Sequence, residues 1–232
     1  MLIKKIILTA ISLFYIGGCF AQETVEKKNR INEHVTEVFQ VRKDSVQIKE
    51  GSYQAFYRRK IPLAIGHYVH NKKIGQWYFY DQKGKLLQMY NYTKDSLRYE
   101  AREDTTSHLR YLIDKVISDT DRVTKPVKAG GRYYGYLPYL GLFKTPIEPY
   151  VFDAPGSIIT IQLLISPLGW LAEYKVHLFS PLYRVDESTI MDVRLFKEED
   201  RQFIPATFNH DAILSRIIIR CRVTDDGGLD FF

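Results

Sequence analysis

Residues 66–90, GHYVHNKKIGQWYFYDQKGKLLQMY, decide the fold of the N-terminal half. Aromatic and β-branched residues, which favour strands, fill this stretch, and Lys83-Gly84 marks a turn within it. Similar short runs lie on both sides, and Glu50-Gly51 marks another turn. Short strands at a spacing of about 8–12 residues are typical of an antiparallel meander. We therefore expect strands within residues 34–41, 52–57, 66–70, 76–81 and 86–92.

The same stretch carries a short motif. Gly75-Gln-Trp77-Tyr-Phe-Tyr80, followed by the turn at Gly84, resembles the Gly-x-Trp-x-x-Tyr core of MORN-type repeats, and a weaker copy begins at Gly51. The resemblance implies hairpins with stacked rings over residues 22–100. Repeat arrays usually need about three units for independent stability. Because this stretch is shorter than such an array, we expect it to pack against flanking strands or a second domain.

Two kinds of side chain in the meander are candidates for a site. Trp77, Tyr78 and Tyr80 are expected in the core and at its rim, and the alternative is an exposed aromatic surface formed by Tyr68, Trp77 and Tyr80. His67 and His70 would point to opposite faces of a strand, so we expect no metal site there.

The N-terminus has the features of a secretory signal peptide over residues 1–21. Lys4 and Lys5 precede an apolar run at 6–16, and small residues follow that run. The run is too short for a membrane-spanning helix, which needs about 20 apolar residues. The sequence therefore predicts an exported protein.

Two routes of processing remain open. Cleavage before Gln22 would release the chain, whereas Ile16-Gly17-Gly18-Cys19 resembles a lipobox in which Cys19 is lipidated. Both routes predict a periplasmic or outer-membrane-associated protein. Membrane association is expected only through a lipid on Cys19.

Charge and cysteine content exclude several classes of protein. The 232-residue chain has a formal net charge of +6, and removal of residues 1–21 takes away Lys4 and Lys5 but no acid, which leaves +4. Such a mild basic excess does not indicate nucleic-acid binding, which needs Lys and Arg clustered on one face. After release, Cys221 would be the remaining cysteine, and its apolar strand neighbours favour inert packing in the core.

Enzyme motifs are not found in the sequence. It contains no G-x-S-x-G, no G-x-x-x-x-G-K-[ST] and no H-E-x-x-H. We therefore expect a non-catalytic protein with no cofactor and no metal site.

Residues 101–125 are expected to connect two domains. The apolar residues of 109–117 follow helical spacing, but the same stretch is equally compatible with a last strand of the meander. Asp119-Thr-Asp-Arg and Lys125-Pro126 mark a domain boundary near 120–126.

Residues 126–224 are expected to form a small second domain, and residues 225–232 a tail. The sequence favours strands at 157–166, 170–179 and 213–223. Asp186 and Glu187 would open a helix that ends before Pro205. With the meander, this predicts an α+β protein whose C-terminal domain has an antiparallel three-stranded sheet and two helices.

This order of elements resembles the C-terminal domain of TonB-type energy transducers. The matching residues are Gly130-Gly131, Pro146, Gly156, Gly169, Asp186-Glu187 and Phe203-Ile204-Pro205-Ala206. The resemblance implies a periplasmic domain whose last strand, or the edge beside it, pairs with a short peptide of an outer-membrane transporter. That family also has an inner-membrane anchor and a Pro-rich spacer, which this sequence does not match. The resemblance therefore implies partner binding more than force transduction.

The final strand supplies the candidate contacts. Arg216, Ile218, Arg220 and Arg222 would share the face opposite the apolar one. This face is either a docking stripe for an acidic peptide or a solvated sheet face. We expect an exported interaction protein that binds an envelope protein, such as an outer-membrane transporter, by strand addition. The alternative is a module that binds glycan or lipid headgroups through its aromatic hairpins.

Overall fold

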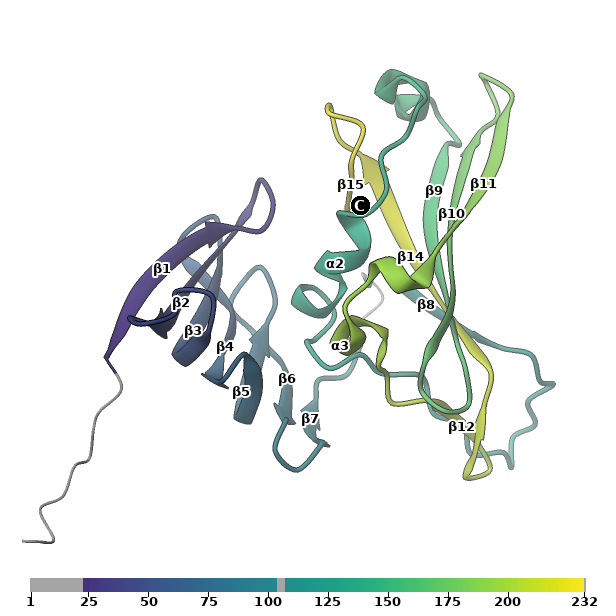
Figure 1. Cartoon of the computed structure of the whole chain (residues 1–232). Coiled ribbons are helices and arrows are strands. Elements are labelled where there is room, and N and C mark those ends of the chain that lie inside the picture. Colours follow the sequence, from purple (N-terminus) through teal and green to yellow (C-terminus); the bar gives the residue numbers. More distant parts are fainter. Residues whose placement is uncertain (1–22, 104–106, 232) are drawn as a thin grey trace, which may run out of the picture.

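The computed structural model describes residues 23–103 and 107–231, which form mainly antiparallel β-sheet (Figure 1). Strands hold 51% and helical turns 9% of these residues. The expected α+β class is therefore wrong, and the fold is mainly β. The predicted signal peptide, residues 1–21 with Cys19, lies outside the described residues. Among the residues described, no helix combines the length and apolar character needed to cross a membrane.

The N-terminal sheet is a meander in which each strand pairs with the next one along the chain. Its seven strands are β1 (Thr24–Arg30), β2 (Val35–Arg42), β3 (Lys49–Tyr57), β4 (Ile61–Val69), β5 (Lys72–Tyr80), β6 (Leu86–Asn91) and β7 (Ser96–Glu100). Gly84 lies in the turn between β5 and β6 with φ +84, a conformation that glycine adopts without strain.

Packed aromatic rings line one face of this sheet. Trp77 of β5 is fully buried, and the ring centroids of Tyr53 and Tyr68 each lie 5.3 Å from it. Gly66 of β4 makes room for the indole, because a Cβ at this position would lie 2.1 Å from the Trp77 ring. Tilted and edge-to-face contacts of this kind are favourable arrangements for aromatic pairs.

The second sheet has six strands. They are β8 (Leu109–Ile113), β9 (Ile158–Ile165), β10 (Leu171–Ser180), β11 (Val185–Met191), β14 (Ser215–Val223) and β15 (Leu229–Phe231). The order runs β11-β10-β9-β14, and both β8 and β15 pair with β14 on the side away from β9. The short strands β12 (Ala206–Phe208) and β13 (Asp211–Ile213) form a separate hairpin.

The helix expected from Asp186 is wrong, because Asp186 and Glu187 belong to strand β11. The whole of Val185–Met191 pairs with β10. The β-branched residues of this run suit a strand, and the pairing satisfies backbone groups that a helix would satisfy internally. Instead of capping a helix, Asp186 Oδ1 lies 2.8 Å from His177 Nε2 on β10.

Helical structure is limited to short turns. These are η1 (Tyr134–Tyr136), α2 (Leu137–Leu140), η2 (Pro149–Asp153), η3 (Val193–Leu195) and α3 (Glu198–Arg201).

The expected three-stranded sheet is also wrong, because flanking segments join it. Residues 109–113 form strand β8, the second of the two open alternatives, but β8 pairs with β14 and not with the meander. Residues 229–231, expected in a tail, form β15. The side chains of Leu109, Leu229 and Phe231 are buried, so both segments gain apolar burial by completing the sheet.

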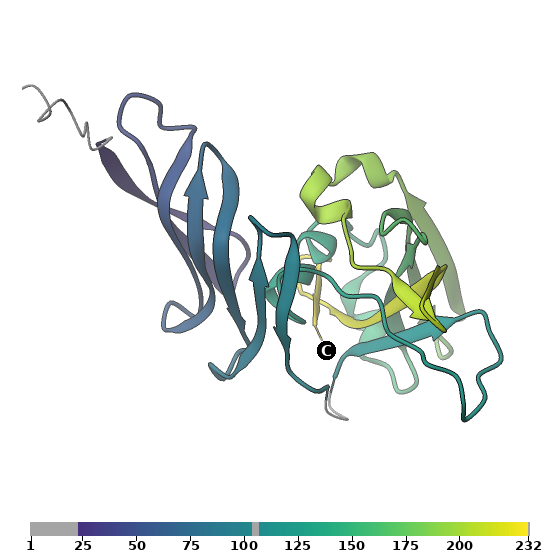
Figure 2. The same ribbon diagram turned by 90° about the horizontal axis from the view of Figure 1, so that it is seen from below.

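The two sheets share one hydrophobic core, with η1 and α2 between them (Figures 1 and 2). The buried side chain of Gln88 on β6 fixes this junction. Its Oε1 accepts hydrogen bonds from the amides of Gly130 (2.8 Å) and Gly131 (3.0 Å), and its Nε2 donates to the Lys128 carbonyl (3.0 Å). The meander is thus joined directly to the chain that follows residue 126.

Candidate functional site

A cleft of about 1050 Å³ lies between the N-terminal sheet and the segments η1, α2 and α3. One wall, called here the sheet wall, includes Glu37, Lys49, Tyr68 and Lys73, and the opposite wall includes Tyr134 and Glu199. Large clefts between two parts of a chain are common sites of ligand binding.

A buried carboxylate, Glu37 of β2, organises one part of the sheet wall. Its Oε1 accepts a hydrogen bond from Asn29 Nδ2 (3.0 Å). Its Oε2 accepts from the Tyr53 hydroxyl (2.8 Å) and from Lys49 Nζ (3.2 Å). Burial raises the pKa of Glu37, but these donors outweigh burial and lower it overall, so the carboxylate is ionised at neutral pH.

The same network crosses the cleft. The Tyr53 hydroxyl gives its single proton to Glu37, and the hydroxyl of Tyr134 on η1 lies 2.6 Å from it. Tyr134 is therefore the donor in this second bond. The bond holds η1 against the N-terminal sheet.

Lys49 at the start of β3 is held by aromatic rings. Its Nζ lies 4.1 Å from the centroid of Phe39, 5.1 Å from that of Tyr53 and 5.3 Å from that of Tyr68. Ring faces attract an ammonium ion, and the ion pair with Glu37 adds to this attraction. The ammonium group is thus fixed in position by the fold.

Lys73 of β5 repeats this arrangement. Its Nζ lies 5.5 Å from the centroid of Trp77 and 5.3 Å from that of Tyr92, and 2.9 Å from Glu199 Oε2 across the cleft. Only 14% of the side chain is exposed. Burial lowers the pKa of Lys73, but the neighbouring tyrosines and Glu199 outweigh burial, so its pKa is raised and it stays charged.

The two lysines occupy equivalent places in two similar stretches. Both stretches have the pattern Lys-x-Gly-x-aromatic, with Lys49, Gly51 and Tyr53 in one and Lys73, Gly75 and Trp77 in the other. Both glycines have positive φ, +99 and +63. Sequence reasoning recognised the glycines and rings but missed the lysines, and this shared pattern is the signal that could have found them.

Lys128 fixes the opposite wall. Its buried Nζ donates hydrogen bonds to the backbone carbonyls of Glu199 and Gln202 (3.0 Å for Gln202) and lies 5.1 Å from the Phe203 centroid. Burial lowers the pKa of Lys128 to about 8. Lys128 thus positions α3 and the chain after it.

Further charged groups line the cleft. Among the described residues, no carboxylate lies at ion-pair distance from Arg30, Lys72 or Lys197. Arg30 donates instead to the backbone carbonyls of Asn32 and Glu33. The acids Asp95, Glu198 and Asp200 also line it.

The candidate aromatic surface is mostly buried. Tyr68 and Trp77 lie in the core beside the cleft, and Tyr80 is partly exposed at the end of β5. Tyr68 lines the cleft itself. The rings of Tyr68 and Trp77 therefore pack on each other and present no flat exposed platform.

The candidate docking stripe lies on the solvent-facing side of β14. Arg216, Ile218, Arg220 and Arg222 alternate with buried residues along the strand, and none of the four lines the cleft. Arg216 Nη1 donates to Gln162 Oε1 (2.8 Å). Because β9 pairs with one edge of β14, and β8 and β15 with the other, the backbone of these residues offers no edge for a further strand.

One edge of the second sheet is β11, and β8 and β15 form the opposite edge. Among the residues that the structure describes, only β10 pairs with it. Most of its side chains are exposed, including Ile190 at 64%. Sequence reasoning missed this edge because it assigned a helix to the same residues.

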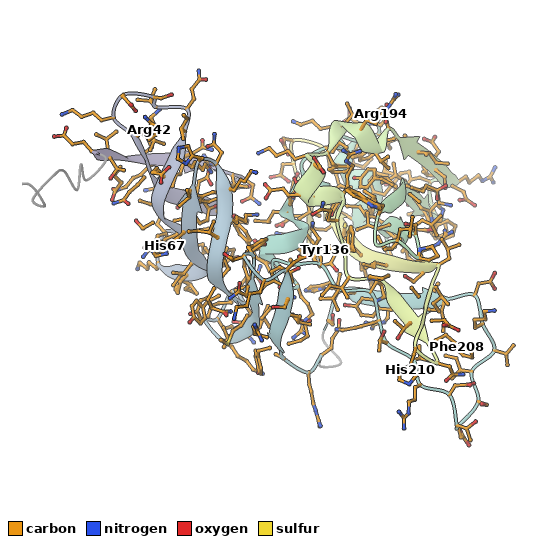
Figure 3. All side chains as sticks on the ribbon, turned by 60° about the horizontal axis from the view of Figure 1, so that its bottom comes forward. Arg42, His67, Tyr136, Arg194, Phe208 and His210 are labelled. Carbon is orange, nitrogen blue, oxygen red and sulfur yellow. The ribbon has the colours of Figure 1, made fainter. Side chains whose placement is uncertain are left out.

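Two further candidates from the sequence are His67 and Cys221. Among the described residues, no group of three or more His, Cys, Asp or Glu could hold a metal ion. His67 is exposed on the N-terminal sheet, away from the junction where Tyr136 lies (Figure 3). Cys221 is buried in β14, and burial raises the pKa of its thiol to about 12.

Comparisons of the chain with protein-family models, with curated proteins and with solved structures find no match.

Proposed function

We propose that the chain is an exported, non-catalytic binding protein of the cell envelope that docks an extended segment of a partner protein along β11. The free edge of β11 is the observation that carries this proposal. An edge strand presents a row of unpaired N–H and C=O groups, and a partner strand can pair with them.

The composition of β11 favours it over β1 as the docking edge. β1 carries Lys27, Lys28 and Arg30, and charged side chains of this kind protect an edge strand from pairing. In β11, the stretch Ser188-Thr189-Ile190 is free of charge and exposed. A strand added there would extend a sheet that is already well ordered around β9, β10 and β14.

The resemblance to the TonB C-terminal domain supplies the expected partner. In that family the peptide belongs to an outer-membrane transporter and adds to a sheet edge. We propose a partner of the same kind here, with β11 in place of the final strand. Main-chain hydrogen bonds would supply affinity, and the side chains flanking Ile190 would supply specificity for the partner.

Site-specific photo-crosslinking in cells tests the docking edge. A crosslinking residue at Ser188 is expected to capture an envelope protein, whereas the same residue at Lys83, exposed in the β5–β6 turn, is expected to capture none. Equal capture from both positions would contradict the proposal.

Proline substitutions provide a second test. The N–H groups of Ser188 and Thr189 point to opposite edges of β11, one toward β10 and the other away from it. Proline removes the N–H of the residue it replaces, so one of S188P and T189P removes only the N–H that points away from β10. That variant should keep the wild-type unfolding midpoint and lose the crosslinked partner. Undiminished capture by the variant with the unchanged midpoint would rule out strand addition at this edge.

A further inference from the structure

The ammonium groups of Lys49 and Lys73 are both held over aromatic rings in the cleft. Lys49 lies over Phe39, Tyr53 and Tyr68, and Lys73 lies over Trp77 and Tyr92. The two cages adjoin each other, because the centroids of Tyr53 and Trp77 are 5.3 Å apart.

Each cage is already occupied by a cation of the chain itself. A cationic ligand would therefore have to displace a lysine from its rings and from its carboxylate. An anionic ligand needs no displacement, because an ammonium group has three N–H donors and each lysine uses one of them on a carboxylate, Glu37 or Glu199. Both side chains remain partly exposed to the cleft, 27% for Lys49 and 14% for Lys73.

The sheet wall of the cleft carries more basic than acidic residues. Its basic residues are Arg30, Lys49, Lys72 and Lys73, and its acids are Glu37 and Asp95. Glu37 is satisfied by its three donors, and Asp95 accepts a hydrogen bond from the Tyr90 hydroxyl. The hydrogen-bond donors that this wall offers to a ligand are therefore mainly the cationic groups of its lysines and arginine.

Apart from the acids of the opposite wall, the lining also has groups that suit a hydroxyl-rich ligand. Tyrosine hydroxyls and the amides of Asn29 and Asn71 can exchange hydrogen bonds with sugar hydroxyls. The indole of Trp170 is 37% exposed in the cleft lining and has the Arg201 guanidinium 6.0 Å from its ring centroid. Its exposed part offers an apolar surface for the C–H face of a sugar. The cleft, at about 1050 Å³, has room for several sugar units.

We propose that this cleft binds an oligosaccharide with carboxylates on successive sugars, and that Lys49 and Lys73 bind those carboxylates, while the exposed Lys72 lies at the rim of the cleft. Fixed ammonium groups lose little conformational entropy on binding, which favours affinity. Two ammonium groups in adjoining cages select for a ligand with more than one carboxylate. This site is independent of strand addition at β11.

Titration calorimetry with the purified protein tests the proposal, with trigalacturonate as the probe. Maltotriose, tri-glutamate and inorganic phosphate are the comparison ligands. We expect measurable binding of trigalacturonate that weakens as salt increases, and at least about tenfold weaker binding of each comparison ligand. Equal binding of maltotriose or phosphate, or no binding of trigalacturonate at millimolar concentration, would overturn the proposal. Stronger binding of tri-glutamate would replace it with a peptide site.

Matched variants locate the site. K49M keeps an apolar stem over the rings and removes the charge, and K83M makes the same change in an exposed turn. We expect about tenfold weaker binding for K49M, about threefold weaker binding for K72Q at the rim, and an unchanged dissociation constant for K83M. K72Q changes an exposed lysine with no ion pair among the described residues, so it reports on binding even where K49M alters stability. Unchanged affinity in K72Q and K49M would place the ligand elsewhere.

Discussion

The hydroxyl oxygens of Tyr53 on β3 and Tyr134 on η1 lie 2.6 Å apart, although the two residues are 81 positions apart in the chain. Tyr53 in turn donates to the buried carboxylate of Glu37. This chain of hydrogen bonds holds the segment after the connector against the N-terminal sheet. It also sets the spacing of the two walls of the cleft.

Removing the Tyr134 hydroxyl should loosen this junction. Y134F deletes one donor while Tyr53 keeps its bond to Glu37, so we expect a loss of about 1 kcal/mol in the free energy of unfolding. Urea unfolding measures the change. Y78F removes a hydroxyl from an exposed ring and serves as the control, with no expected loss. A loss in Y134F no larger than in Y78F would show that the bond does not stabilise the junction.

The Gln88 side chain should contribute more to the free energy of unfolding than the Tyr134 hydroxyl, because it is the hydrogen-bond partner of several buried groups. Q88L leaves the amides of Gly130 and Gly131 and the carbonyl of Lys128 without this partner. Each such group costs about 1–3 kcal/mol, so we expect a total loss of roughly 2–4 kcal/mol after relaxation.

The control for this change is Q54L on the exposed face of β3. Urea unfolding of Q54L should remain within about 0.5 kcal/mol of the wild type. A similar midpoint for Q88L and Q54L would mean that the junction does not depend on the Gln88 side chain.

The meander could be predicted from sequence because its signals are local. The glycine turn at Gly84 and the aromatic runs on either side of it define strands without reference to the rest of the chain. β11 could not be predicted in this way. Its side chains are mostly exposed and show no apolar alternation, so its pairing with β10 decides its conformation.

β8 and the cleft also depend on contacts between residues that are far apart in the sequence. Leu109 and its neighbours have a spacing compatible with a helix or a strand, and pairing with β14 decides between them. The cleft brings Glu37, Lys73 and Glu199 together from segments far apart in the chain. A single sequence gives the local pattern around each of these residues but not their proximity.

Gly66 should be among the least replaceable residues of the meander. A methyl group at this position would lie 2.1 Å from the ring of Trp77, which is fully buried and cannot move away without disturbing its neighbours. We expect G66A to lose about 2–3 kcal/mol of stability and to change the tryptophan emission. G141A, where a Cβ meets nothing within 4 Å, is the matched control and should change neither. Wild-type stability in G66A would mean that the sheet adjusts at this contact.

The thiol of Cys221 should be unreactive in the folded protein. It is buried in β14 and burial raises its pKa to about 12, so little thiolate forms at pH 8. In a C19S background, we expect a thiol reagent to modify Cys221 only as fast as the protein unfolds. S188C in the same background places a thiol on exposed β11 and should react rapidly. Rapid modification of Cys221 without denaturant would contradict its burial.

Lys128 should make stability increase with pH in the mildly alkaline range. Its pKa in the folded protein is about 8, below its ordinary value of 10.5. Between these two values the unfolded chain binds more protons than the folded chain, so the free energy of unfolding rises as the pH rises.

The variant K128M isolates this contribution, because the many buried tyrosines affect both proteins alike. From pH 7.5 to 9.5, we expect the stability of the wild type relative to K128M to increase by about 2 kcal/mol. Urea unfolding at several pH values measures this difference. A difference that stays constant with pH would mean that Lys128 keeps its ordinary pKa, and that its ammonium group is better solvated than its burial beneath α3 implies.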